Sequence, residues 1–310
     1  MRLTNFLPLT SDVPYCRHSC MKRQMPIENM HGKVCIVTGA NAGIGRATAL
    51  GLARQGATVA MICRSHERAE EACTAICSVT GNQAVNFFLA DLSSQAEIHQ
   101  LAQELLARYP QMHVLVNNAG VFHLKRSTSV DNIETVFAVN HLAYFLLTHL
   151  LLERLTASGA ARIVNVASRV HQIGVLDFND LQNERSYRPM QVYGRSKLCN
   201  ILFTRELSRR ISGTGVTANA VHPGGVATNL GHNNGRLAKL IAIALRPFLR
   251  TPEQGADSVL YLATAPEVAT VSGKYFSNRR AVQPSPAAQD DAVARRLWRV
   301  SAELTGIEGG

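Results

Sequence analysis

Between a short apolar run and a helical pattern, the chain reads Thr38-Gly39-Ala40-Asn41-Ala42-Gly43-Ile44-Gly45. Glycines in such a turn let the backbone approach a pyrophosphate, and the helix that follows offers amide donors and the positive end of its dipole. A glycine-rich turn alone also fits ordinary turn chemistry. Its place between the first strand and the first helix favours a dinucleotide-binding loop. The predicted contacts are Gly39, Asn41, Gly43 and Ile44.

The rhythm of the remaining chain predicts the fold around this turn. Continuously apolar runs alternate with amphipathic segments, which is typical of parallel strands covered by helices on both faces. The predicted strands span residues 33–37, 58–63, 85–89, 113–116, 162–166 and 216–221, with a further strand near 273–276. The predicted helices include 46–54, 95–108, 137–155 and 196–210. We expect an α/β fold, a single-domain Rossmann-type doubly wound parallel sheet of about seven strands.

No linker or internal repeat divides the chain. We therefore expect a flexible N-terminal extension over 1–30 and a single dinucleotide-binding catalytic domain over 31–305, with a small helical substrate lid near 229–252. The lid prediction rests on Arg236–Arg250, which is rich in apolar residues and carries four positive charges and no acid. The same segment also fits an amphipathic helix packed on the domain, or one resting on an anionic membrane surface.

Composition restricts the class of protein. A hydrophobic content of 46% and a charged content of 17% are ordinary for a globular chain. The net charge of +10 fits a basic rim around a polyanionic cofactor, and no motif accompanies it to indicate nucleic-acid binding. Seven cysteines without metal-ligand spacing suit a reducing compartment and no metal site. We take Leu237–Leu249 as the longest apolar run. Because charges interrupt it, we expect a cytoplasmic protein, with peripheral membrane contact left open.

The end of the second predicted strand, Ile62-Cys63-Arg64-Ser65, indicates which dinucleotide binds. NAD sites usually place an acid there for the ribose 2′-hydroxyl. Here the acid is absent and Arg64 offers a bidentate donor for a 2′-phosphate, although an arginine at a strand end can also be merely solvated. The pattern favours NADP (NADPH) as the cofactor. Further contacts are expected at the ends of the third and fourth strands, from Asp91, Leu92, Asn118, Ala119 and Gly120.

Tyr193 and Lys197 lie four residues apart and therefore on one face of a helix. A free tyrosine titrates near ~10, and a neighbouring ammonium stabilises the phenolate and lowers that pKa. Such pairs also occur by chance on protein surfaces. Ser168 strengthens the interpretation, because it follows the fifth strand and so emerges at the same sheet edge as the glycine turn.

In this combination the sequence resembles the short-chain dehydrogenase/reductase family over about residues 32–305. Its motifs follow the family's order: the glycine turn, Asn117–Gly120, Asn140, Ser168, Tyr193 with Lys197, and Pro223-Gly224. The resemblance implies that Tyr193 is the general acid in reduction and the base in oxidation, and that Ser168 holds the substrate oxygen.

The resemblance also implies roles around the nicotinamide. Lys197 would bind its ribose and lower the pKa of Tyr193, and Asn140 would hold a water that links Lys197 to solvent. Besides Tyr193 and Lys197 themselves, the cofactor contacts implied at this end are Pro223, Gly224, Val226 and Thr228.

Within the family, the chain resembles the NADP-preferring retinol dehydrogenases in segments 177–181, 196–207, 221–226, 228–232 and 293–298. This likeness implies a small hydrophobic carbonyl or alcohol substrate of retinal-like character. The first 28 residues contain no continuous apolar run like the membrane anchor those relatives commonly carry. A soluble aldehyde reductase or a broad carbonyl reductase therefore fits as well as a retinoid enzyme.

We expect an NADP(H)-dependent oxidoreductase that interconverts a carbonyl and an alcohol. The alternative is a non-catalytic dinucleotide-binding sensor or scaffold, which would usually lose the tyrosine or the lysine. An epimerase or dehydratase would call for a larger sugar-nucleotide domain. Family resemblance leaves a homodimer open, through the helices that precede and contain Tyr193.

Overall fold

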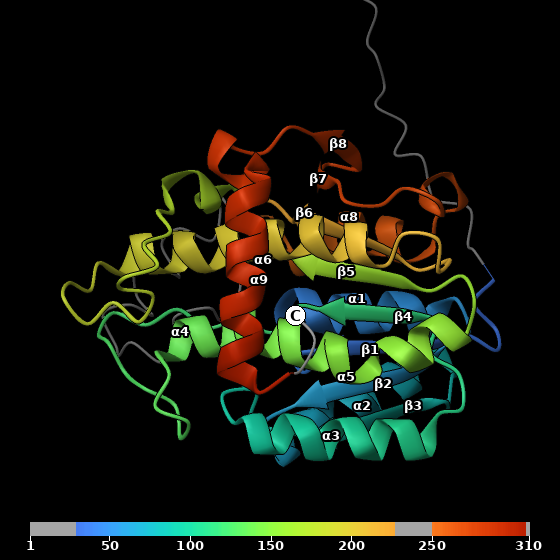
Figure 1. Cartoon of the computed structure of the whole chain (residues 1–310). Coiled ribbons are helices and arrows are strands. Elements are labelled where there is room, and N and C mark those ends of the chain that lie inside the picture. Colours follow the sequence, from blue (N-terminus) through green and yellow to red (C-terminus); the bar gives the residue numbers. More distant parts are fainter. Residues whose placement is uncertain (1–28, 227–249, 308–310) are drawn as a thin grey trace, which may run out of the picture.

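A single eight-stranded sheet runs through the computed structural model, which describes residues 29–226 and 250–307 (Figure 1). The strand order is β3-β2-β1-β4-β5-β6-β7-β8, and every pair up to β7 is parallel. The strands are β1 (Val34–Thr38), β2 (Thr58–Cys63), β3 (Val85–Leu89), β4 (Val114–Asn117), β5 (Arg162–Val166), β6 (Thr217–His222), β7 (Tyr275–Ser277) and β8 (Arg280–Val282). The order reverses between β1 and β4, which confirms the Rossmann-type sheet.

The eighth strand is an addition to the predicted seven. It pairs antiparallel with β7 through a two-residue turn, where Asn278 and Arg279 have φ of 51° and 60°. Positive φ at both central positions is typical of a tight hairpin turn. All three residues of β8 are exposed, so no apolar run marks this strand in the sequence.

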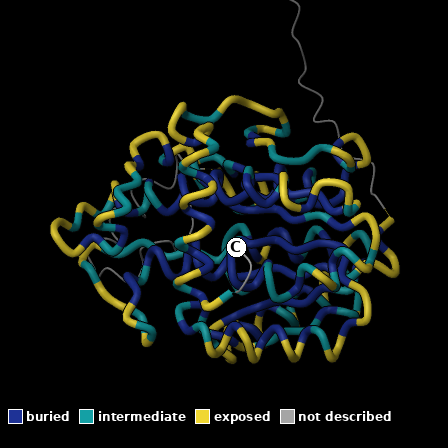
Figure 2. The backbone as a smooth tube through the Cα atoms, in the orientation of Figure 1, coloured by how far each residue is buried: buried dark blue, intermediate teal, exposed yellow. Residues whose placement is uncertain are grey.

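Helices cover both faces of the sheet (Figure 1), and each face has its own core. Buried residues fill the interior, and exposed residues lie mainly at the periphery (Figure 2). One core packs α1 (Gly43–Arg54), α2 (His66–Thr80) and α8 (Pro252–Thr264) against the sheet, and the other packs α3 (Gln95–Arg108), α5 (Ala143–Ala157) and α6 (Pro189–Arg210). Neighbouring residues of a strand contribute to opposite cores: Cys35 and Val37 to the first, Ile36 to the second. This two-sided burial explains why β1 and β2 lack the alternation of apolar and polar residues that a half-exposed strand shows.

The C-terminal helix α9 (Asp291–Thr305) lies across α5 and α6 (Figure 1). Trp298 is 4% exposed, and its ring centroid lies 5.1 Å from that of Phe145 on α5 and 5.9 Å from that of Phe203 on α6. The chain therefore covers part of these two helices with its own α9. The homodimer expected through α5 and α6 stays a prediction, and it would have to form around α9.

One helix in the described parts of the chain is long and apolar enough, by length and composition, to cross a membrane. It spans Thr135–Ala157 with a mean hydropathy of 1.5, and 78% of its most apolar window is buried. It joins α4 (Thr135–Phe137), a π-helical turn (Ala138–Leu142) and α5 into one core helix. The apolar run expected at Leu237–Leu249 lies outside the described residues.

The predicted domain boundaries are only partly within the described residues. Residues 1–28 of the extension and 229–249 of the lid lie outside them. Met30, the last residue of the predicted extension, is 8% exposed, and its amide donates to the Gln55 carbonyl at 2.8 Å. Thr251 forms the capping box of α8, so the last two residues of the predicted lid begin a core helix instead.

Candidate active site

The glycine turn closes tightly where β1 leads into α1. Gly39 and Gly43 have φ of 66° and 54°, in the left-handed region that favours glycine. At Gly45 a Cβ would overlap the Gly39 carbonyl and lie 2.5 Å from Asn118 Nδ2. Asn118 Nδ2 in turn donates to the Thr38 carbonyl at 2.8 Å. At Gly45 the turn therefore leaves no room for a side chain.

Thr38, which was not among the predicted site residues, holds this turn against the loop that follows β4. Its hydroxyl oxygen accepts hydrogen bonds from the amides of Asn118 and Ala119, both at 2.9 Å. These bonds fix two predicted cofactor contacts relative to the glycine turn. A threonine at the end of a strand is the signal that could have indicated this role.

A cleft of about 930 Å³ follows the carboxyl edge of the sheet, within the range of small-molecule sites. Every predicted cofactor residue within the described chain lines it, and Thr228 lies outside the described residues. The predicted residues in its wall are Gly39, Asn41, Gly43, Ile44, Arg64, Asp91, Leu92, Asn118, Ala119, Gly120, Ser168, Tyr193, Lys197, Pro223, Gly224 and Val226. In the described part of the chain, no group of three or more His, Cys, Asp or Glu could hold a metal ion.

The β2 end of this cleft holds more basic residues than Arg64 alone. Arg46 and Arg68 line it together with Arg64. The Arg64 guanidinium lies 3.7 Å from the Asp91 carboxylate, and both side chains are partly exposed. Arg46 directly follows the glycine turn and Arg68 lies four residues after Arg64, so both spacings were available as signals.

Tyr193 and Lys197 both lie on α6, which begins at Pro189. Lys197 is 2% exposed, its Nζ donates to the Val166 carbonyl at 3.0 Å, and it lies 5.6 Å from the centroid of the Tyr193 ring. Burial lowers the pKa of Lys197 to about 7. Burial also raises the pKa of Tyr193 above its ordinary value.

The shift in the pKa of Tyr193 is opposite in direction to the shift expected from its lysine neighbour. Removing a phenolate from water raises the pKa of Tyr193. A lysine that titrates near neutrality is charged only part of the time. Tyr193 therefore keeps its proton through the neutral range. This is the state that a proton donor needs.

Asn140 lies beneath the cleft rather than in its wall. It sits in the π-helical turn with no exposed surface. Its Oδ1 accepts from the Val121 amide at 2.7 Å, and its Nδ2 donates to the Val121 carbonyl and to Ser196 Oγ, both at 3.0 Å. Asn140 thus fixes the chain at Val121 in the cleft wall to the helix of Tyr193. Its water-holding role stays a prediction.

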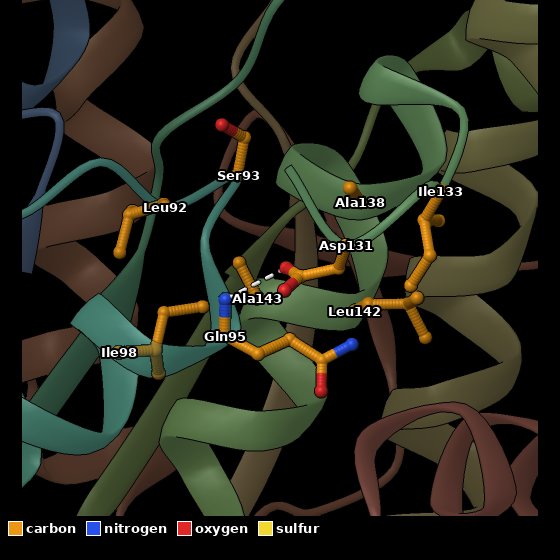
Figure 3. Close-up of a pocket in the computed structure, with 9 residues that line it drawn as sticks. All are labelled: Leu92, Ser93, Gln95, Ile98, Asp131, Ile133, Ala138, Leu142 and Ala143. Atoms are coloured by element: carbon orange, nitrogen blue, oxygen red, sulfur yellow. Dashed lines mark hydrogen bonds between the residues drawn. The ribbon is translucent and has the colours of Figure 1, made fainter. Parts of the chain in front are cut away.

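A second, very small pocket lies behind this π-helical turn (Figure 3). Its volume of about 10 Å³ is the space of one water molecule at most. Asp131 Oδ2 accepts from the Gln95 amide at 2.9 Å and so satisfies the start of α3. Ala138 and Leu142, the two ends of the turn, form part of the wall. The pocket belongs to the packing that supports Asn140, and it is too small for a substrate.

Ser168 follows β5 and caps the 3₁₀ helix η2 (Arg169–Ile173). Its Oγ accepts from the Val170 amide at 3.3 Å. This bond uses an oxygen lone pair, so the hydroxyl hydrogen can still be donated to another oxygen. Because Ser168, Tyr193 and Lys197 line one cleft, the arrangement can bind an oxygen atom and give it a proton.

The lowered pKa of Lys197 predicts a pH dependence of stability. Lys197 loses its proton near pH 7 in the folded protein and near its ordinary value of 10.5 in the unfolded chain. Between these values the unfolded chain binds more protons, so stability rises with pH and is lost as pH falls through this window. We expect the unfolding free energy of the wild type, relative to Lys197→Met, to rise from pH 7 to 10. Chemical denaturation of both proteins across this pH range measures the difference in unfolding free energy. A difference that does not change with pH would contradict the lowered pKa.

Comparisons with known proteins agree with this geometry. The profile of the family described as short chain dehydrogenase matches residues 33–237. Retinol dehydrogenase 12 of Mus musculus is 46% identical over 277 residues, which cover 89% of this chain and 87% of that protein.

Solved structures show the same fold. An uncharacterized protein from Mycobacterium paratuberculosis superposes with a TM-score of 0.74 at 31% identity, covering 90% of this chain and 95% of that one. The RhlG/NADP active-site complex of Pseudomonas aeruginosa has a TM-score of 0.65 at 28% identity, covering 82% of this chain and 97% of that one. The chain is thus an oxidoreductase related to retinol dehydrogenases, and it belongs to the short-chain dehydrogenase/reductase family.

Proposed function

We propose that this protein is an NADP(H)-dependent oxidoreductase that interconverts a hydrophobic carbonyl compound and its alcohol. The observation that carries the proposal is the shared cleft, in which Ser168, Tyr193 and Lys197 meet the glycine turn. A proton donor, an oxygen-binding hydroxyl and a dinucleotide loop are the parts that carbonyl reduction needs.

The residues present fit a bound dinucleotide. Gly39 and Gly43 line the cleft without a side chain, so the backbone of the turn can come close to the pyrophosphate, and the amides at the start of α1 add donors. Arg64, Arg46 and Arg68 would hold the adenosine end. Lys197, Pro223 and Gly224 would hold the nicotinamide end. When bound, NADPH supplies the hydride that reduces the carbonyl carbon.

The protein's own groups orient the carbonyl oxygen and supply its proton. Ser168 donates a hydrogen bond that orients this oxygen, and protonated Tyr193 donates a proton to it as negative charge develops. Charged Lys197 then stabilises the phenolate of Tyr193. Asn140 keeps Val121 and Ser196 in place around them. In the oxidation direction, Tyr193 accepts the proton again.

Arg64 is proposed to select NADPH over NADH by pairing with the 2′-phosphate. A hydrogen bond to a charged group contributes about 1.5–3 kcal/mol, so we expect Arg64→Gln to raise KM for NADPH about 10- to 100-fold, with KM for NADH unchanged. Steady-state kinetics with both cofactors measure this. Arg54→Gln is the control, because Arg54 ends α1 as an exposed basic residue. Equal changes for both cofactors would contradict the role of Arg64.

The substrate class follows from the relatives and from the cleft. The cleft wall includes the apolar side chains of Val121, Phe122 and Val226, and the Phe122 ring lies edge-on to Tyr193 at 5.8 Å. The relative named retinol dehydrogenase supports a retinal-like compound. A non-catalytic sensor or scaffold has no observation in its favour, because the full Ser168, Tyr193 and Lys197 group is retained.

NADPH oxidation by the purified protein tests this proposal. The probes are retinal, decanal and acetophenone, which represent retinoid aldehydes, medium-chain aldehydes and aromatic ketones. We expect turnover of at least one probe, with the highest kcat/KM for an apolar aldehyde. NADPH binding without oxidation in the presence of any probe would favour the non-catalytic alternative.

A further inference from the structure

We propose that His171 is a positioning residue, which fixes the backbone of Ser168 and thereby the hydroxyl that orients the substrate oxygen. The inference rests on the proposed function, because it concerns the reaction in which Ser168 acts. His171 is 1% exposed and lies on η2, three residues after Ser168.

The hydrogen bonds of His171 determine which of its ring nitrogens carries the proton. Nε2 lies 3.0 Å from the Ser285 amide nitrogen, which can only donate, so Nε2 is the acceptor. Nδ1 lies 2.7 Å from the Ser168 carbonyl oxygen, which can only accept, so Nδ1 carries the hydrogen and donates it. Neutral His171 with its proton on Nδ1 therefore satisfies both partners at once.

Ser168 is held on both sides by this short helix. Its carbonyl oxygen accepts from the His171 amide at 3.1 Å as well as from the His171 ring. Its Oγ accepts from the Val170 amide. Of these three bonds, only the one from the His171 ring links Ser168 to a distant part of the chain. The other nitrogen of the same ring bonds to Ser285, more than a hundred residues away.

That distant segment anchors the imidazole. Ser285 precedes the 3₁₀ helix η6 (Pro286–Gln289), and its amide bonds to the ring edge that faces away from Ser168. The Tyr275 ring of β7 packs edge-on to His171, with centroids 5.1 Å apart. Burial lowers the pKa of His171, which keeps the ring neutral as its two partners require. Through His171, Ser168 is thus held in place by Tyr275 and Ser285, which come after β6 in the chain.

Two substitutions separate the two ring bonds. In His171→Asn, the side-chain amide takes the place of Nδ1 and can still donate to Ser168, but the Ser285 amide loses its acceptor. In His171→Gln, the amide oxygen reaches the place of Nε2 and can accept from Ser285, but the donor to Ser168 is lost. Both variants remove the ring that packs on Tyr275, so both should lower the Tm.

The experiment compares kcat and KM of both variants for NADPH-dependent reduction of retinal or decanal. We expect His171→Gln to lose about 10- to 100-fold in kcat, because small misplacements of a catalytic group cost that much, with KM for NADPH unchanged. His171→Asn should keep most of the kcat despite its lower Tm. His149→Gln is the control: His149 bonds to the Phe145 carbonyl on α5, beside Trp298, so its loss should lower the Tm alone.

Each outcome decides the matter. If the wild type reduces the aldehyde and His171→Gln retains full kcat, or if both variants lose kcat equally, His171 does not position Ser168 and the inference fails alone. If the wild type reduces none of the probe carbonyls, the proposed function fails and this inference fails with it.

Discussion

Replacing Tyr193 by phenylalanine is expected to lower kcat for carbonyl reduction by about 10²- to 10⁴-fold, the usual contribution of general acid–base catalysis. The substitution removes the hydroxyl that holds the proton and leaves the ring, which packs edge-on against Phe122. Affinity for NADPH should therefore change little, and the loss should fall on kcat.

Steady-state and binding measurements on the same preparations test this expectation. Tyr109→Phe is a matched control, because Tyr109 is 6% exposed and lies at the end of α3, outside the cleft wall. It should leave kcat unchanged. If Tyr193→Phe kept more than about a tenth of the wild-type rate, which is a barrier difference below about 1.4 kcal/mol, Tyr193 would not be the proton donor.

Replacing Gly45 by alanine should weaken NADPH binding about 10- to 100-fold, because overpacking costs about 1–3 kcal/mol. The added Cβ overlaps the Gly39 carbonyl and crowds Asn118 Nδ2. The carbonyl is backbone, so relief requires the glycine turn itself to move. The substitution should also lower the free energy of unfolding.

Gly81→Ala is the control, because it introduces backbone strain without a steric overlap. Gly81 ends α2 with φ of 71°, and a Cβ there meets nothing within 4 Å. We expect it to lower stability without changing NADPH affinity, as measured by denaturation and by titration of the cofactor. An unchanged affinity in Gly45→Ala would mean that the turn does not cradle the pyrophosphate.

The central parallel strands were predictable because they are buried on both faces. β2, β3 and β5 begin and end at the predicted residues, since continuous apolar runs between turns are typical of such strands. β8 was not predicted because its residues are exposed and form no apolar run. The π-helical turn that contains Asn140 has no distinctive sequence pattern in Ala138–Leu142 and depends on the hydrogen bonds that surround it.

The candidate site was predictable to the extent that it lies at strand ends. Arg64, Asp91, Asn118 and Ser168 each follow a parallel strand within two residues, and such positions gather at one sheet edge. The raised pKa of Tyr193 could not be predicted, because spacing reveals a charged neighbour but not the burial that raises the pKa. His171 was expected from the sequence only to shape the loop after Ser168. Its bond to Ser285 could not be predicted, since Ser285 lies beyond three further strands.

Transfer of deuterium from labelled NADPH tests the central claim most directly. The protein is given NADPH with deuterium on one face of nicotinamide C4, and in a second reaction on the other face, together with retinal or decanal. The account predicts that the alcohol formed carries deuterium on its carbinol carbon in one of the two reactions and not in the other. Alcohol without deuterium in either reaction, or no alcohol from any of the probe carbonyls, would contradict it.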